Sequence, residues 1–385
     1  MTGAPQGPRP PWRTRLPAPN GVRAQLPGFE GVRLSLEQAE ASLDATADRL
    51  SIPRSVLGVG DFNILAISGG AAGGAFGAGV LVGLTRSGRR PDFAIVTGVS
   101  TGALIAPFAF LGPEWDGRLS DAYIGGHAAQ TLGIGGISPA PGSGLFRSET
   151  LERLIDPFVD AAMVAAVAEQ HALGRRLLVA TTDLDRQKPC IWDMGEIASR
   201  GGETAVRMFR DVLVASASLP GLFPPRRFPC TNDDVEYEEM HVDGGVSAPL
   251  FIMPEALLRW RKLGRRLHRG RIYFIVNTVL EPAPRTTSPN LPAILMRSFD
   301  TMLRVSYRQA LNVAVTFCVA HNLPFSVASI PDATANGNML NFDTASMRRT
   351  FDQAAELAQQ PDFWQTPKPR PEPWENLLDL LNFDS

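Results

Sequence analysis

The stretch 62–84 reads FNILAISGGAAGGAFGAGVLVGL, and the stretch 93–111 reads FAIVTGVSTGALIAPFAFL. Each begins with a short apolar run, passes through a turn that contains glycine, and continues as a helix-like segment. A strand, a turn and a helix repeated in this order are typical of parallel strands covered by helices on both faces. The two stretches therefore predict an α/β fold, a three-layer α/β/α sandwich with a mostly parallel central sheet.

Further elements are predicted on both sides of these stretches. Apolar runs predict strands at 177–181, 190–192, 239–242 and 272–277, and periodicity predicts helices at 35–52, 205–217 and 290–320. A segment rich in proline and arginine, 1–30, is predicted to be a disordered arm. Residues 31–358 are predicted to form one catalytic domain, with its motifs at about 62–250, and 359–385 a proline-rich tail.

The composition excludes several classes of protein. The 385 residues carry a formal net charge of −2, which gives no drive toward nucleic acid. The three cysteines are scattered, and the histidines show no ligand spacing, so neither a disulfide framework nor a metal site is predicted. We expect no cofactor.

The N-terminus and two uncharged stretches give expectations about where the protein is located in the cell. No apolar stretch follows Met1, so the sequence as written predicts a cytoplasmic or peripheral membrane protein, whereas an upstream leader would place it in the cell envelope. The uncharged stretches 64–84 and 94–112 approach the ~20 residues that a bilayer span needs. Their glycines and the charges that flank them favour buried strand–helix units instead.

The motif Gly98-Val99-Ser100-Thr101-Gly102 lies between a predicted strand and a predicted helix. This is the setting that a G-x-S-x-G nucleophile elbow requires. The N-terminus of the helix would direct free N–H groups and a positive dipole end at the serine, which favours the charged form of its oxygen. Ser100 is therefore the predicted nucleophile.

A second motif, Ser68-Gly69-Gly70-Ala71-Ala72-Gly73-Gly74, also follows a strand and precedes a helix. Such a turn exposes backbone N–H groups that bind a phosphate or a developing oxyanion. A P-loop would need a Lys-Ser/Thr pair after its last glycine, and a dinucleotide site would need an acid at the end of the next strand. Since both are missing, an oxyanion loop is the favoured interpretation.

A third motif, Asp243-Gly244-Gly245, follows the predicted strand 239–242 and can deliver one carboxylate to the edge of the sheet. A simple turn aspartate that bonds its own backbone is the alternative. His241 stands two residues earlier, on the same face of the strand, so a Ser–His pair is a further alternative to a structural histidine.

Together the three motifs resemble the patatin-like phospholipase family of bacterial acyl hydrolases, and the resemblance extends over about 62–250. The segment 216–225, SASLPGLFPP, is similar to the family's small-residue segment before the aspartate. The resemblance implies a catalytic dyad of Ser100 and Asp243, and an oxyanion hole formed by the backbone N–H groups of Gly69, Gly70 and Ala71. It implies hydrolysis of the carboxylic esters of phospholipids or other acyl lipids through an acyl-enzyme, with peripheral membrane contact as a further expectation.

Two positions depart from the family pattern. Members often have glycine where Ala71 stands, and arginine or lysine where Gly73 stands. Alanine keeps its N–H, so this donor survives unless the site needs a positive φ. These departures motivate the alternative of a weak or inactive lipid-binding protein on the same fold, while the sequence indicates nothing about the oligomeric state.

Overall fold

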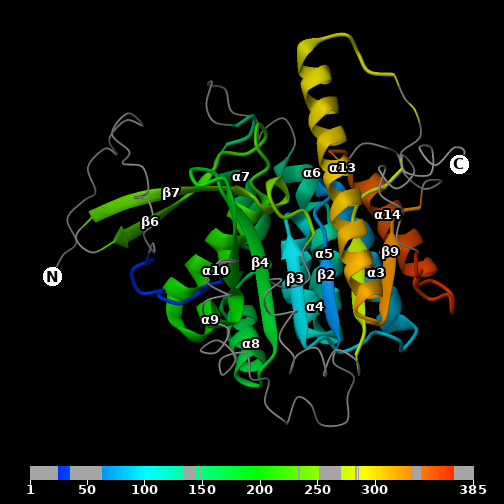
Figure 1. Ribbon diagram of the computed structural model, residues 1–385, viewed down its shortest axis with the longest axis horizontal. Coiled ribbons are helices and arrows are strands. Elements are labelled where there is room, and N and C mark those ends of the chain that lie inside the picture. Colours follow the sequence, from blue (N-terminus) through cyan, green and yellow to red (C-terminus); the bar gives the residue numbers. More distant parts are fainter. Residues whose placement is uncertain are drawn as a thin grey trace, which may run out of the picture.

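The computed structural model describes residues 25–34, 63–132, 144–147, 149–232, 235–250, 270–281, 284, 286–331 and 340–367 (Figure 1). Within them, one sheet runs through the molecule in the order β1-β5-β4-β3-β2-β8-β9, and β7 joins it beside β4 and pairs with β6. Its strands are β1 (Arg33–Leu34), β2 (Ile64–Ile67), β3 (Ile95–Val99), β4 (Arg176–Asp183), β5 (Lys188–Asp193), β6 (Arg226–Asn232), β7 (Val235–Asp243), β8 (Ile272–Val276) and β9 (Phe325–Ser329).

The middle of the sheet is parallel. β2 pairs in parallel with β3 and β8, β3 with β4, and β8 with β9. The other pairings, β1 with β5, β5 with β4, β4 with β7 and β7 with β6, are antiparallel. The predicted mostly parallel sheet is confirmed, and the parallel strands β2 and β3 bring the carboxyl ends that carry the first two motifs to one edge. The third motif follows the antiparallel strand β7, whose Asp243 pairs with Thr181 of β4.

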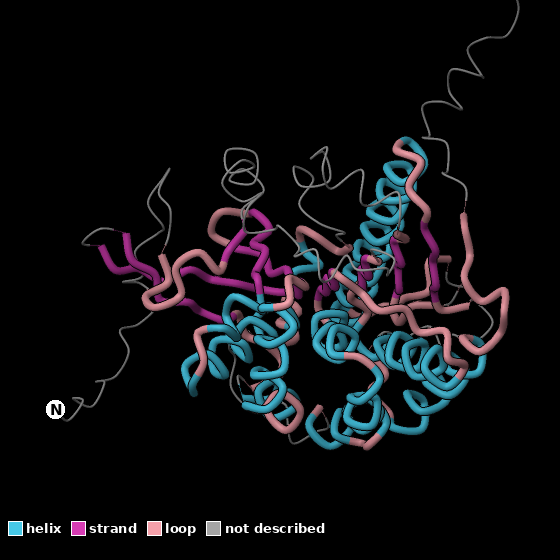
Figure 2. The backbone as a smooth tube through the Cα atoms, turned by 90° about the horizontal axis from the view of Figure 1, so that it is seen from below, coloured by secondary structure: helices cyan, strands magenta, loops and turns pink. Residues whose placement is uncertain are grey.

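Helices cover both faces of the sheet, as predicted. Figure 2 shows most of them on one side of the strands and one long helix on the other. The long helix is α13 (Leu291–Ala320), whose Leu311, Ala314 and Val315 pack on Ile64 and Phe274. The larger core lies on the opposite face, where the remaining helices are α3 (Gly74–Arg86), α4 (Thr101–Leu111), α5 (Asp116–Ile124), α6 (His127–Thr131), α7 (Glu149–Ile155), α8 (Ala161–Ala172), α9 (Met194–Ser199), α10 (Gly202–Ala217) and α14 (Thr344–Leu357).

The glycines of helix α3 allow it to pack closely against α14. A Cβ on Gly79 would lie 2.2 Å from the carbonyl oxygen of Phe351, and one on Gly83 would lie 2.3 Å from that of Ala355. These two glycines are four residues apart and form one face, which lets α14 approach the backbone of α3. The uncharged stretch 64–84 is therefore a buried strand–helix unit, and no helix among the described residues combines the length and apolarity of a membrane span.

Both ends of the predicted catalytic domain need correction. Leu26 and Phe29, within the predicted arm, are buried, and Gln25 pairs with Thr231. At the other end, Gln365 pairs with Val327, and Trp364 packs on Tyr273 with ring centroids 5.0 Å apart. Apolar side chains near each boundary thus join the core, despite the prolines around them. The predicted helix 35–52, the rest of the arm and the tail beyond 367 lie outside the described residues.

Candidate active site

Ser100 lies in a sharp turn between β3 and α4. Its backbone has φ 56° and ψ −127°, a conformation that a residue with a Cβ rarely adopts. A Cβ on Gly98 would lie 2.5 Å from the carbonyl oxygen of Gly102, and a Cβ on Gly102 would lie 2.4 Å from that of Ile67. Both motif glycines are therefore required by the close approach of backbone, and the turn has the strained geometry of a nucleophile elbow.

The side chain of Ser216, at the end of α10, supports this turn. The backbone N–H of Ser100 donates to Ser216 Oγ at 3.0 Å, and Ser216 Oγ donates to the carbonyl oxygen of Ala180 at 2.7 Å. Ser216 is fully buried, so both bonds form away from water. The segment 216–225 was noted for its similarity to the family, but the hydrogen bond of Ser216 with the Ser100 turn was not predicted.

Asp243 ends β7 directly beside β4, where it pairs with Thr181. Its backbone is held on both sides, since its N–H donates to the carbonyl oxygen of Ser218 at 3.0 Å and its own carbonyl accepts from Thr182 Oγ1 at 2.9 Å. Its Oδ1 accepts from the N–H of Gly245 at 2.7 Å. The strand therefore delivers the carboxylate to the site with little freedom, as the third motif predicted.

The carboxyl of Asp243 is buried, with 1% of the residue exposed. Burial raises its pKa to about 7, and the hydrogen bonds with Ser100 and with the N–H of Gly245 partly oppose this. Oδ2 is buried and has no partner of ordinary hydrogen-bond geometry among the described residues. A carboxyl with a pKa near 7, one unpaired oxygen and a serine hydroxyl beside it is equipped to act as a general base.

The glycine-rich loop 69–71 leads into the short 3₁₀ turn Ala71–Gly73. Within the described part of the chain, the N–H groups of Gly69, Gly70 and Ala71 donate to no backbone carbonyl. Gly70 has φ 152°, and Ala71 has φ 50°, so the site does demand a positive φ from its alanine. Gly70 and Ala71 line the same pocket as Ser100, and a Cβ on Gly69 would lie 2.9 Å from Ser100 Cβ.

Asn277, just beyond β8, holds this loop in place. Its Nδ2 donates to the carbonyl oxygen of Ser68 at 2.8 Å, its N–H donates to Ser68 Oγ at 2.9 Å, and its Oδ1 accepts from the N–H of Gly77 at 3.0 Å. A Cβ on Gly73 would lie 2.1 Å from the Asn277 carbonyl oxygen. The family's arginine or lysine therefore has no room at position 73, because the backbone of Asn277 closes on it. The asparagine ends an apolar run, a signal that sequence analysis could have used.

A pocket of about 1000 Å³, a volume that includes its open mouth, begins at Ser100. Its walls are mainly aliphatic and aromatic side chains from α4, α7, α10 and the segment after it, among them Leu104, Phe108, Leu154, Phe158, Leu213 and Phe223. Hydroxyl groups enter the lining through Ser100, Thr101, Tyr123 and Tyr307. Ser100 thus lies beside other hydroxyl groups at one end of a largely apolar cavity.

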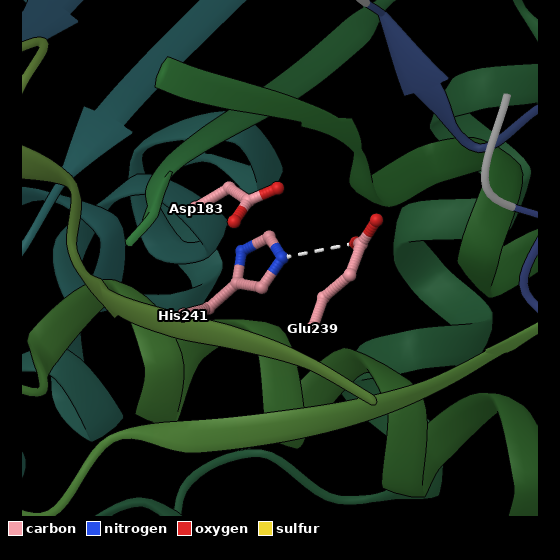
Figure 3. Close-up of side chains that lie close together, drawn as sticks. All are labelled: Asp183, Glu239 and His241. Carbon is pink, nitrogen blue, oxygen red and sulfur yellow. Dashed lines mark hydrogen bonds and ion pairs between the residues drawn. The ribbon is translucent and has the colours of Figure 1, made fainter. Parts of the chain in front are cut away.

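His241 belongs to a separate buried cluster with Asp183 and Glu239 (Figure 3). Its Nδ1 lies 2.8 Å from Thr181 Oγ1 and its Nε2 lies 3.3 Å from Glu239 Oε2, so both ring nitrogens have partners other than Ser100. Burial lowers the pKa of His241, which favours the neutral ring. The structural interpretation of His241 is the one that this geometry favours.

The same three side chains have ligand atoms within 4.8 Å of one another, a spacing that a metal ion could use. However, Arg33 binds Glu239 at 2.6 Å, and Arg186 binds Asp183 at 2.8 Å and also Glu239. Two guanidinium groups already neutralise the two carboxylates, and a divalent cation among them would meet like charge. The donor set fits an ion-pair network and does not fit a metal ion.

A family model for the patatin-like phospholipases matches residues 65–255. This match covers the elbow, the glycine-rich loop and the Asp243 turn. The chain carries a patatin-like phospholipase domain. Among solved structures, VipD from Legionella pneumophila is similar to this chain at 12% identity and a TM-score of 0.34, over 77% of this chain and 66% of that one. No curated protein sequence matches the chain significantly.

Proposed function

We propose that this chain is a serine lipid acyl hydrolase, which cleaves carboxylic esters of phospholipids or other acyl lipids through a Ser100–Asp243 dyad. The match of residues 65–255 to the patatin-like phospholipase family supports this activity. The observation that carries the proposal is the arrangement at Ser100, where a strained serine, a buried carboxyl and an apolar pocket meet. The pocket suits an acyl chain, because its walls offer apolar contact along its length.

In the proposed reaction, Ser100 Oγ attacks the ester carbonyl carbon while its proton passes to the unpaired Oδ2 of Asp243. The N–H groups of Gly69, Gly70 and Ala71 stabilise the negative charge on the carbonyl oxygen. Asp243 then gives its proton to the departing alcohol, which leaves an acyl group on Ser100. Water, activated by Asp243, releases the fatty acid in the second half of the cycle.

The test is product analysis with defined lipids. The purified chain and its Ser100→Ala variant are incubated with phospholipids that carry different acyl chains at the two glycerol positions, and the products are identified by mass spectrometry. The proposal expects free fatty acid and lysophospholipid from the native chain and none from the variant. Release at the same rate from both, or from neither, would contradict it. Peripheral membrane contact and cellular location stay predictions from the sequence.

A further inference from the structure

Tyr307 reaches the reactive centre from α13, a helix that contributes no motif. The residue is 2% exposed and lines the pocket. A Cβ on Gly69 would lie 2.4 Å from Tyr307 Oη and 2.9 Å from Ser100 Cβ. A Cβ on Gly245 would lie 3.4 Å from the same Oη and 2.9 Å from Asp243 Oδ1. The hydroxyl therefore lies between the glycine-rich loop and the turn that follows Asp243.

This hydroxyl has no hydrogen-bond partner among the described residues. The other buried tyrosine of the pocket is different, since Tyr123 Oη lies 3.0 Å from Thr101 Oγ1 and donates to the Thr101 carbonyl oxygen. A tyrosine hydroxyl that lines a pocket and makes no hydrogen bond within the described part of the chain is free to donate to a ligand there. Burial and the negative charge of Asp243 raise the pKa of Tyr307, which keeps it a donor.

In the proposed reaction the departing alcohol oxygen receives a proton from Asp243, and no second hydrogen-bond donor has yet been assigned to it. When the tetrahedral intermediate collapses, the bond from the carbonyl carbon to the alcohol oxygen breaks, and its electron pair stays on that oxygen. Asp243 supplies the proton, while the loop N–H groups stabilise the other oxygen. Tyr307 Oη lies near both segments that flank this centre, 2.4 Å from the position of a Cβ on Gly69 and 3.4 Å from that of a Cβ on Gly245.

We propose that Tyr307 is a further catalytic residue, whose hydroxyl hydrogen-bonds the alcohol oxygen of the scissile ester as that oxygen departs. The proposal rests on the proposed function. Tyr307 keeps its own proton, because the proton that the alcohol acquires comes from Asp243. A hydrogen bond formed as charge grows on this oxygen speeds the reaction most when the alcohol is a poor leaving group.

The test compares Tyr307→Phe with the native enzyme on two esters of the same fatty acid, one with an acidic phenol and one with a primary alkyl alcohol as leaving group. Active sites are counted by titration with a fluorophosphonate, so that kcat/KM refers to folded enzyme. We expect Tyr307→Phe to lower kcat/KM about 10- to 100-fold for the alkyl ester and less than about threefold for the phenyl ester. Tyr237 is a buried tyrosine on β7 outside the pocket, so Tyr237→Phe is the matched control. It should leave kcat/KM unchanged for both esters.

An equal loss of kcat/KM on both esters would overturn the proposal. Such a loss would indicate a structural role or a contact with the oxyanion, because neither depends on the leaving group. Unchanged rates on both would also overturn it. Tyr307→Met lacks the donor as well and repeats the test if the phenylalanine variant folds poorly. A native protein that neither titrates nor hydrolyses either ester would instead contradict the proposed function, which distinguishes the two failures.

Discussion

At the scale of single residues, the site depends on a carboxyl that is costly to ionise. Asp243 is buried beside Ser100, and burial raises its pKa from 3.8 to about 7. Such a carboxyl binds the serine proton more readily than an exposed aspartate would. The same burial that makes Asp243 a useful base makes its charged form a source of instability.

The pH dependence of the reaction follows from this pKa. Only the ionised carboxyl accepts the Ser100 proton, so kcat/KM should level off above about pH 8, reach half of that value near pH 7 and fall about tenfold per pH unit well below it. The apparent pKa should lie near 7 for the native enzyme. A rate profile between pH 5 and 9, roughly the range in which most folded proteins are stable, measures it with a phenyl ester. A flat profile down to pH 5 would contradict Asp243 as the base.

Replacing Asp243 by asparagine should stabilise the protein and abolish its activity. Because the pKa is raised in the folded state, the ionised carboxyl lowers the free energy of unfolding, and this loss develops as the pH rises from 3.8 to about 7. We expect Asp243→Asn to raise the free energy of unfolding at pH 8 by about 1–3 kcal/mol.

Urea denaturation at pH 8 and at pH 4 checks this expectation. The stabilisation should be present at pH 8 and nearly absent at pH 4, where the native carboxyl is largely protonated. A variant that is less stable at pH 8 would show that the ionised carboxyl contributes stability, contrary to its raised pKa.

At the scale of elements, the site is assembled by strand ends that meet at one edge of the sheet. β2 leads to the glycine-rich loop, β3 to Ser100, β7 to Asp243 and β8 to Asn277. β2 and β8 are paired in register, with Ile67 beside Ile275. The hydrogen bonds of Asn277 extend this pairing past the end of the ladder and fix the loop that presents the N–H groups.

Asn277→Ala should weaken the attachment of the glycine-rich loop to the end of β8. The substitution removes the side-chain bonds to Ser68 and Gly77 in a fully buried place, so we expect a loss of about 2–4 kcal/mol in stability and about tenfold or more in kcat. Asn290→Ala is the matched control, because this exposed asparagine only caps α13 through the N–H of Ala293. Asn290→Ala should lower the free energy of unfolding by about 1 kcal/mol and leave kcat per active site unchanged. Equal kcat losses in both variants would contradict a role for Asn277 in holding the loop.

Local sequence patterns predicted the elements that carry the motifs, because each combines an apolar run with a turn of glycines. They missed the strands β1, β6 and β9. β6 reads RRFPCTN, in which arginines and a proline obscure the alternation of buried Phe228 and Cys230 with their more exposed neighbours, and the strand pairs along its length with β7. Tyr307 escaped prediction for a different reason. It lies in the middle of a 30-residue helix, and only the fold brings it from position 307 to the loop at position 69.

At the scale of the whole molecule, the N-terminal segment 25–34 is part of the domain. Leu26, Phe29 and Val32 are buried in the larger core, and Arg33 forms an ion pair with the fully buried side chain of Glu239. The pKa of Glu239 is lowered, because burial is outweighed by its hydrogen bond with His241 and by its ion pairs with Arg33 and Arg186. The segment therefore both fills the core and neutralises a charge within it.

Two truncations separate this segment from the residues before it. Deleting 1–34 removes three buried apolar side chains and leaves Glu239 with one guanidinium partner, so we expect a loss of at least about 4 kcal/mol in stability. Deleting 1–24 should leave the melting temperature nearly unchanged, since the sequence predicts no core residues there. Thermal unfolding of both proteins measures the difference. A similar loss in each would show that residues 1–24 also contribute to the core.

The most direct test of the central claim, that Ser100 is a nucleophile activated by Asp243, is covalent labelling with a fluorophosphonate followed by peptide mapping. The native chain should carry one adduct, on the peptide that contains Ser100. Ser100→Ala should carry none, and Asp243→Asn, although folded, should label far more slowly. A folded native chain that stays unlabelled, or one whose adduct persists in Ser100→Ala, would contradict the account.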